Sequence, residues 1–314
     1  MLIFYSFLMN LKSKYEHSRP FVKVLQWMGA VFLLTFIAAI LMALIQAIAG
    51  VGEANINYLK AVQALQTVSV FLLPPFVVAY LWSARPLHYL HLQKPTCPSA
   101  LWGLVPLSML IAAPGINLLA YLNAQMTLPA FLQPLEDLMR EMEQRAETLT
   151  LQFLQVRSVG ALLVNLLVMA LLPALGEELT FRGLLLNALS PKSDTSDAAR
   201  LTPSSHIAVW GVAILFSAVH FQFYGFLPRM LIGAYLGYLL VWTGSLWVPV
   251  LAHFTNNAFA VIASFIAFRY DMDTTQIESL GTNDTLWLGI LSLFLTLILI
   301  LFISKRSTTL NTKL

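Results

Sequence analysis

The stretch ALLPALGEELTFRGLLLNAL, residues 170–189, is apolar along most of its length and belongs to an apolar run that covers about residues 160–188. An α-helix needs roughly 20 apolar residues to cross the hydrocarbon core of a bilayer, and this run is long enough. Three ionisable side chains nevertheless interrupt it: Glu177, Glu178 and Arg182. A single charged residue at the centre of a spanning helix costs about 2.5–3.5 kcal/mol on insertion scales, so this cluster indicates a site inside the membrane.

The composition of the whole chain is that of a membrane protein. Hydrophobic residues make up 58% and charged residues 11% of its 314 residues, whereas a soluble domain carries roughly 25% charged residues. The mean hydropathy is +0.75. The net charge of +3 is small and the basic residues are scattered, so we expect no nucleic-acid partner. The single cysteine, Cys97, excludes an intramolecular disulfide framework and a cysteine-rich metal site.

Apolar runs near the length of a membrane span recur along the chain and predict an all-α fold, a polytopic bundle of about eight transmembrane helices. Pro74 and Pro75 in the second run, and Pro106 and Pro114 in the third, predict kinks or partly unwound turns. No stretch between the runs is long enough for a separate soluble domain. The eight runs cover residues 25–49, 62–83, 100–124, 160–188, 206–226, 228–243, 246–268 and 286–303.

The basic residues in the loops predict which side of the membrane each loop faces. If the N-terminus is inside, the cytoplasmic side holds Lys12, Lys14, Arg19, Lys23, Arg85, Lys94, Lys192, Arg200, Lys305, Arg306 and Lys313, and the opposite side holds fewer: Lys60, Arg140, Arg145, Arg157, Arg229 and Arg269. We therefore expect both termini in the cytoplasm. The predicted organisation is a cytoplasmic N-terminal segment at 1–24, one integral membrane domain at 25–303 and a cytoplasmic tail at 304–314.

One segment differs from the spans. Residues 129–154 place leucines and Met142 among charged side chains at helical spacing. This pattern is typical of an amphipathic helix that lies on a membrane surface. We expect it on the outer surface.

The spacing inside the charged run separates two roles. Glu178 precedes Arg182 by four residues, so the two side chains lie on the same face of a helix in the favourable order. A purely structural buried ion pair is one interpretation of this pair. Glu177 points about 100° away from Glu178 on a helix, so we expect it to face a different partner.

Two later apolar runs offer such partners. Phe216 and His220 lie one helical turn apart, and so do His253 and Asn257. The other four histidines fall in loops or at the ends of the runs. A single intramembrane histidine or asparagine often only packs or joins helices. Together with the acidic residues, however, these side chains predict convergence on one pocket.

The converging set supports two kinds of chemistry. A carboxylate beside an imidazole activates water, with Glu177 as general base and His220 holding the water or moving its proton. His253 and Asn257 then donate hydrogen bonds to a developing oxyanion, and the reaction is hydrolysis of a peptide bond. Alternatively, Glu177, His220 and His253 bind Zn²⁺ with an open position for water. The sequence leaves the metal-free and the zinc scheme equally open.

The order Glu-Glu-x-x-x-Arg at 177–182, Phe-x-x-x-His at 216–220 and His-x-x-x-Asn at 253–257 resembles the three motifs of the CPBP family. This family comprises type II CAAX prenyl endopeptidases and bacteriocin-processing and self-immunity (Abi) proteins. The resemblance implies an α-helical intramembrane protease of the metallo or glutamate type, with its core at about residues 160–268. By position it implies that Glu177 and His220 activate water, that His253 and Asn257 form the oxyanion site, and that Glu178, Arg182 and Phe216 support them.

The expected function is therefore an intramembrane endopeptidase that cleaves a membrane-associated peptide or protein. The alternatives are a catalytically inactive self-immunity or binding protein and, with less support, a transporter, which also places charged residues at mid-membrane. We expect membrane lipid and a peptide as partners. The short loops and the positive bias are compatible with a bacterial plasma membrane protein, for which a prenylated substrate is not expected.

Overall fold

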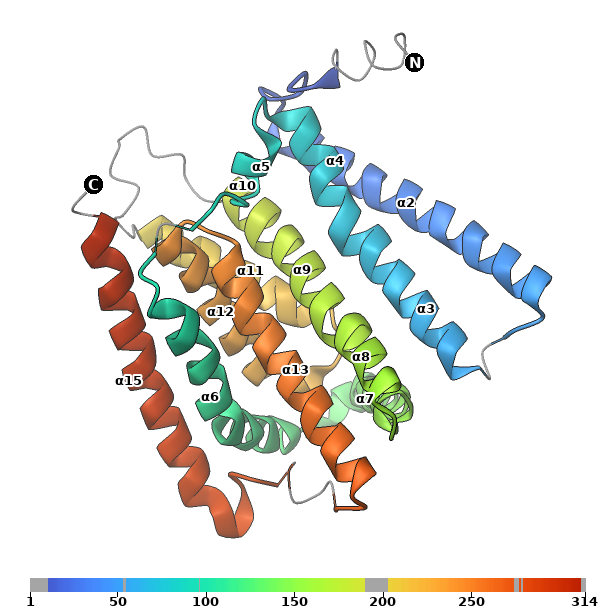
Figure 1. Cartoon of the computed structure of the whole chain (residues 1–314), viewed down its shortest axis with the longest axis vertical. Helices are drawn as coiled ribbons and strands as arrows, with labels where there is room; N and C mark the ends of the chain where they lie inside the picture. The colour runs from blue at the N-terminus through green and yellow to red at the C-terminus, as the bar shows by residue number, and fades with distance from the viewer. Residues whose placement is uncertain are drawn as a thin grey trace.

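The computed structural model describes residues 11–52, 55–95, 97–189, 203–273, 277 and 279–311, and all regular structure in them is helical (Figure 1). The predicted all-α class is confirmed. Lys192, Arg200 and Lys313 of the predicted cytoplasmic set lie outside the described residues. The helices are α2 Pro20–Ala49, α3 Ile56–Thr67, η1 Val68–Leu72, α4 Leu73–Trp82, α5 Pro86–Tyr89, α6 Leu101–Ala124, η2 Ala130–Leu132, α7 Gln133–Leu154, α8 Val159–Asn165, η3 Leu166–Leu171, α9 Leu172–Glu178, η4 Leu179–Leu186, α10 Asn187–Leu189, α11 Pro203–Ala218, η5 Phe223–Gly225, α12 Phe226–Thr243, α13 Trp247–Arg269, η6 Asn283–Thr285 and α15 Leu286–Asn311.

Within the described residues, seven helical segments are long and apolar enough to cross a membrane, so the polytopic bundle is confirmed. The eighth predicted run, 206–226, forms only the shorter helix α11. This helix ends at Ala218, and the chain turns through Phe221, whose φ of 53° lies in the left-handed region. The seven segments are Phe21–Ala49, Ile56–Trp82, Leu101–Ala124, Val159–Leu189, Phe223–Thr243, Trp247–Arg269 and Asn283–Ser307.

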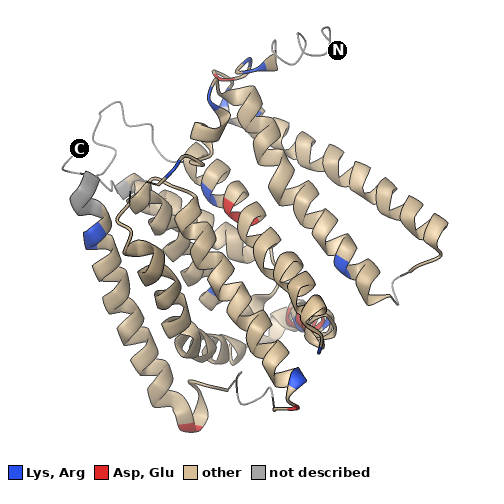
Figure 2. Cartoon of the chain, in the orientation of Figure 1, with Lys and Arg blue, Asp and Glu red and all other residues tan. Residues whose placement is uncertain are grey.

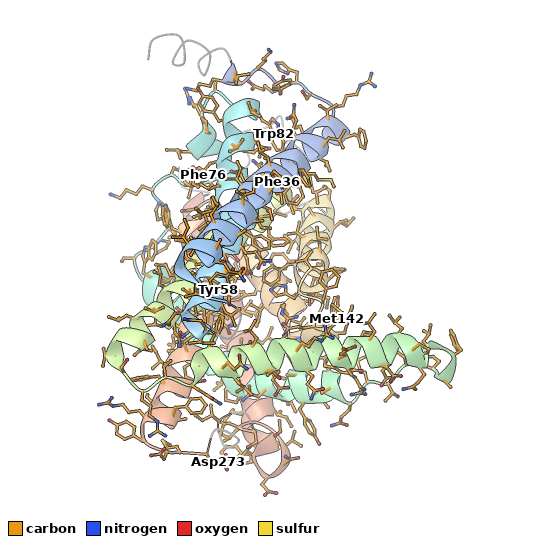
Figure 3. The ribbon with its side chains drawn as sticks, turned by 90° about the vertical axis from the view of Figure 1, so that its right-hand side faces the viewer. Phe36, Tyr58, Phe76, Trp82, Met142 and Asp273 are labelled. Atoms are coloured by element: carbon orange, nitrogen blue, oxygen red, sulfur yellow. The ribbon has the colours of Figure 1, made fainter. Side chains whose placement is uncertain are left out.

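The segments run up and down between two ends of the molecule. The start of α2 and the end of α15 lie at the same end (Figure 1). The predicted amphipathic segment forms α7, on which Met142 is labelled, and it runs across the spanning helices toward the opposite end (Figure 3). Glu136 joins the first turn of α7 to the preceding loop, because its carboxylate accepts hydrogen bonds from the Leu128 N–H at 2.8 Å and from Arg140 Nη2 of the same helix at 2.6 Å.

The prolines of α6 do not break the helix, although the helix is bent (Figure 1). Around Pro114, the Ser292 hydroxyl of α15 accepts a hydrogen bond from the Gly115 N–H at 3.0 Å and donates one to the Ile111 carbonyl. A side chain of a neighbouring helix thus serves the backbone groups that the proline disturbs. Gly115 also lets α15 approach, because a Cβ there would lie 2.7 Å from Leu293 Cδ2.

Two other prolines follow π-helical turns. Pro75 cannot donate to the carbonyl four residues earlier, that of Phe71 in η1, and this oxygen accepts a hydrogen bond from Thr180 Oγ1 at 2.8 Å. Pro173 likewise cannot donate to Met169 in η3, whose carbonyl oxygen accepts from Asn257 Nδ2 at 3.4 Å. The π turns η1, η3 and η4 therefore stand where helices from distant parts of the sequence meet. The largest buried apolar cluster joins α4, η4, α11, α12 and α13 there.

Candidate active site

The charged pair of the opening stretch is fully buried. Arg182 Nη1 donates to Glu178 Oε1 at 2.7 Å, and both side chains are 0% exposed. Arg182 Nη2 donates to the Gly233 carbonyl of α12 at 2.8 Å, and the guanidinium carbon lies 4.5 Å from the centre of the Phe216 ring. The arginine therefore ties η4 to α11 and α12 from the interior. Figure 2 shows acidic and basic colour on α9 and the turns after it, within a bundle that is otherwise almost free of charge.

Glu177 points to a different place from Glu178, as the helix geometry predicts. Its Oε2 atom lies 3.9 Å from His220 Nε2 and 3.9 Å from His253 Nε2. This oxygen is buried and has no hydrogen-bond partner in the protein. The side chain as a whole is 14% exposed, against 26% for His220. A distance of 3.9 Å is too long for a direct hydrogen bond and leaves room for a bridging water.

Both imidazoles are oriented through their Nδ1 atoms. His220 Nδ1 lies 2.7 Å from the Phe216 carbonyl, and His253 Nδ1 lies 2.8 Å from Glu178 Oε1. A carbonyl oxygen only accepts, so His220 Nδ1 carries the proton and the neutral ring has a free lone pair on Nε2. The Glu178 carboxylate also only accepts, so His253 Nδ1 carries a proton as well. The two rings are thus oriented by different partners, a backbone carbonyl and a buried carboxylate.

Both imidazole rings also contact one aromatic side chain, that of Phe216. The centre of the Phe216 ring lies 5.0 Å from that of His220 and 6.0 Å from that of His253, in edge-to-face contact. Phe216 is itself 2% exposed, so it forms a rigid wall between the histidines and the buried arginine.

Asn257 completes the set. Its Oδ1 accepts a hydrogen bond from Asn256 Nδ2 at 3.2 Å, and its own Nδ2 donates to the Met169 carbonyl at 3.4 Å. The neighbouring amide therefore helps to orient Asn257. The long bond to Met169 leaves its N–H groups available to a stronger acceptor in the cavity.

One cavity of about 260 Å³ joins these side chains. Glu177, His220, His253, Asn257 and Phe216 all line it, whereas Glu178 and Arg182 lie behind it. The structure thus brings the sequence-predicted residues to one place. The remaining lining residues are Ile116, Gly225, Pro228, Arg229, Ile232 and Asn256.

The predicted zinc ligands do not have the spacing of a metal site in this arrangement. Two ligand atoms of a tetrahedral zinc ion lie about 3.3 Å apart when the bonds are ~2.0–2.2 Å long, whereas Glu177 Oε2 is 3.9 Å from each histidine nitrogen. Within the part of the chain that the structure describes, no group of three His, Cys, Asp or Glu side chains is placed to hold a metal ion.

Two features of the site were not predicted. The charge count assigned Arg229 to the outer side, at the start of the run 228–243, and gave no sign that its side chain lines the cavity. His220 was predicted inside a spanning helix, but it follows the end of α11, on the turn that leads to η5. The apolar run around α11 continues to residue 226, so hydropathy alone carries no sign of this turn.

Part of the chain is similar to a known protein family. The model of the family described as type II CAAX prenyl endopeptidase Rce1-like matches residues 159–259. The uncharacterized protein YpbD of Bacillus subtilis (strain 168) is 31% identical over 120 residues, which are 37% of this chain and 54% of that protein. The match thus spans about half of the length of this relative. No solved structure matches the chain with significance.

The matched segment contains all three motifs and every residue that they supply to the cavity, from Glu177 to Asn257. The resemblance predicted from the motifs is confirmed for this segment: residues 159–259 match the Rce1-like family of type II CAAX prenyl endopeptidases.

Proposed function

We propose that the protein is an intramembrane endopeptidase in which Glu177 and His220 activate a water molecule. The observation that carries the proposal is the placement of an unpaired carboxylate oxygen, Glu177 Oε2, at 3.9 Å from two imidazole nitrogens on one cavity. A water between these atoms would be within hydrogen-bond reach of all three.

The reaction follows from the partners of each group. The water oxygen attacks the carbonyl carbon of the scissile peptide bond while Glu177 takes a proton from the water, and the free Nε2 of His220 accepts the hydrogen bond of its other proton. The carbonyl oxygen becomes negatively charged, and two donors stabilise it: Asn257 Nδ2–H, and the Nε2–H of His253, which in this scheme is protonated on both ring nitrogens. The protonated Glu177 then donates its proton to the leaving nitrogen as the C–N bond breaks. The immediate products are a carboxylic acid, which keeps the second proton of the water, and an amine, and both ionise on release into water.

The substrate in this proposal is a membrane-associated peptide or protein. An apolar cavity of about 390 Å³ lies beside the polar one and shares Ile116, Pro228 and Ile232 with it. It is lined mainly by apolar side chains of α6, α12 and α15. An apolar segment in this cavity would bring an adjoining peptide bond close to Glu177. We propose that the protein acts in a bacterial plasma membrane.

The test is cleavage of membrane-anchored peptides by the purified protein in lipid vesicles. Glu177→Gln and His220→Ala are expected to reduce cleavage by at least about a hundredfold, the range of general acid–base catalysis, while the thermal unfolding midpoint is retained. Glu141→Gln on the exposed surface of α7 is the matched control and should cleave at the rate of the wild type. Folded protein that cleaves no peptide in a broad library would favour the self-immunity or binding alternative.

A second measurement separates the metal-free scheme from zinc. The proposal expects full activity after dialysis against a strong chelator and no stoichiometric metal in the purified protein. Loss of activity in the chelator, with recovery on addition of Zn²⁺ and a stoichiometric zinc content, would assign Glu177, His220 and His253 as metal ligands instead.

A further inference from the structure

We propose that Arg229 forms a subsite that binds a carboxylate of the substrate close to the scissile bond, either a C-terminal carboxylate or an acidic side chain. This inference rests on the proposed function, because it names a substrate feature read by the same cavity. No family motif includes Arg229, and its position in the cavity is known only from the structure.

Arg229 reaches the catalytic groups from α12. It lies in the first turn of this helix, within a candidate membrane span, and lines the cavity together with Glu177, His220 and Asn257. Arg182, the other arginine nearby, is fully buried behind Phe216 and does not line it. Arg229 is therefore the cavity's arginine among the described residues, and a substrate beside Glu177 would also face its guanidinium.

The guanidinium is held by neutral groups. Nη1 donates to the Gln222 carbonyl at 3.2 Å and Nη2 donates to Gln222 Oε1 at 2.9 Å. The carboxylates that act on it electrostatically are Glu143 and Glu177, and within the described residues neither forms an ion pair with it at 4.0 Å or less. An intramembrane cation without an ion-pair partner, on the wall of a catalytic cavity, points to a function in binding an anionic group.

The remaining N–H groups suit a carboxylate. A guanidinium has five N–H donors in a planar fork, and the two bonds to Gln222 leave donors free on the same plane. Such a fork binds carboxylates through two parallel hydrogen bonds. Gln222 fixes the orientation of the fork before substrate binds, which reduces the entropy lost on binding.

Gly225 provides the space for this arrangement. A Cβ at position 225 would lie 3.1 Å from Arg229 Nη2, closer than ordinary contact distances. The turn through η5 thus supplies both the acceptor that orients the guanidinium and the gap in which it sits.

Glu143 and Glu177 do not satisfy the arginine in place of a substrate. Glu143 accepts the Tyr224 N–H at 3.3 Å from its position on α7, and Glu177 Oε2 faces the two histidines. Both carboxylates lower the net positive potential at Arg229, so discrimination should come from the geometry of the two hydrogen bonds and not from long-range attraction.

The experiment compares three anchored peptides that differ only next to the scissile bond. One carries a free C-terminal carboxylate, one the corresponding amide, and one the amide together with an aspartate side chain. Wild type is expected to cleave one of the two carboxylate peptides with kcat/KM about tenfold or more above that of the neutral amide, the range expected of hydrogen bonds to a charged group. The preferred peptide identifies the source of the carboxylate.

Variants assign the preference to Arg229. Arg229→Gln is expected to abolish the preference by slowing only the carboxylate peptide, and Arg229→Lys to retain part of it, because a lysine keeps the charge but not the fork. Arg145→Gln, which removes an exposed arginine of α7, is the control and should keep the full preference. Equal losses with all three peptides would show that Arg229 only holds the Gln222 turn, and would overturn the proposal.

Measuring peptide binding in an inactive variant tests the carboxylate site independently of the proposed protease activity. In protein carrying Glu177→Gln, the dissociation constants of fluorescent carboxylate and amide peptides are expected to differ about tenfold, and Arg229→Gln in the same background should remove the difference. If this holds while wild type cleaves no peptide, the carboxylate site stands and the proposed protease function fails. If wild type cleaves and neither cleavage nor binding discriminates the carboxylate, the function stands and the site is refuted.

Discussion

A single oxygen atom, Oε1 of Glu178, accepts hydrogen bonds from both Arg182 and His253. Taking a carboxylate and a guanidinium out of water costs several kcal/mol for each ion, and the mutual attraction offsets this only when the geometry is good. The same carboxylate also orients the His253 ring. Glu178 does not line the cavity, yet it contributes both to stability and to the proposed catalysis.

Glu178→Gln should separate the two tasks. An amide at this position keeps the volume and can still accept a hydrogen bond, but it carries no negative charge and holds the His253 ring less firmly. We expect kcat for peptide cleavage to fall about 10–100-fold, the range seen when the hydrogen-bond partner that orients a histidine is replaced, with KM little changed. Steady-state kinetics on an anchored peptide measure this, and an unchanged kcat would show that His253 works without its acidic partner.

Arg182→Leu should lower the free energy of unfolding by about 3–5 kcal/mol, because it leaves the charge of Glu178 buried without its partner. The double variant Glu178→Leu, Arg182→Leu removes both charges and should recover much of this loss. Chemical unfolding in detergent gives the comparison, with Arg145→Gln as an exposed control. Additive losses in the double variant would contradict a coupled pair.

At the scale of elements, the prolines are tolerated because other helices serve the backbone near them. Ser292 bridges two backbone groups of α6, while Thr180 and Asn257 donate to the carbonyls four residues before prolines in other helices. The two sides of each bond are far apart in the sequence, so local propensity does not predict them.

Ser292→Ala should leave the Gly115 N–H and the Ile111 carbonyl without this partner, at a cost of about 1–3 kcal/mol for an unsatisfied buried group. Ser307→Ala is the matched control on the same helix, because the Ser307 hydroxyl only donates to the Ile303 carbonyl of its own turn. Thermal unfolding of both variants in detergent checks the prediction. Equal losses from the two substitutions would refute it.

The stability that Glu136 adds at the start of α7 should depend on pH. The Leu128 N–H, followed by the Arg140 side chain, holds the pKa of Glu136 below its ordinary value. A lowered pKa in the folded state adds stability above the unfolded-state pKa, and this contribution is lost as the pH falls through the folded-state pKa. The difference in unfolding midpoint between wild type and Glu136→Gln should therefore be present at neutral pH and shrink in acid. Glu141→Gln, at an exposed pair, should show little difference at either pH.

The positions of some helices can be predicted from the sequence, and those of others cannot. Span positions follow from hydropathy, which is a local property, and the amphipathic helix follows from the spacing of its leucines. The end of α11 at Ala218 and the π turns depend on contacts with other helices. The position of Arg229 in the cavity was not predicted for the same reason. The sequence shows only that Arg229 lies near the end of an apolar run, and not which side chains of other helices surround it.

In the whole molecule, the start of α2 and the end of α15 lie at one end, because the shorter helix α11 adds one more passage to the seven long segments (Figure 1). The charge bias predicts that this end is cytoplasmic. The three motifs come from separate segments, and only the bundle brings them around one cavity. The order of the motifs in the sequence predicted the family, whereas the distances between their side chains could be obtained only from the structure.

The single cysteine makes the orientation measurable. In a Cys97→Ser background, Ser99→Cys introduces a thiol at an exposed position of the loop before α6, and Glu141→Cys introduces one on α7. A membrane-impermeant thiol reagent added to intact cells should label position 141 and not position 99. Both should react after the cells are permeabilised. The reverse labelling pattern would place the termini outside.

The π turn η4 has a consequence for how the chain can change in length. Eight residues, Leu179–Leu186, occupy this turn between the two acids and α10. A π turn holds more residues per turn than an α-helix, so removal of one residue would allow the segment to rewind as ordinary helix. That rewinding would keep the flanking turns close to their present orientation, because a stretch of α-helix with one residue fewer turns through nearly the same angle. A single-residue deletion at an apolar position of η4 should therefore be tolerated better than one in the middle of α13, where it would rotate the residues beyond it by about 100°.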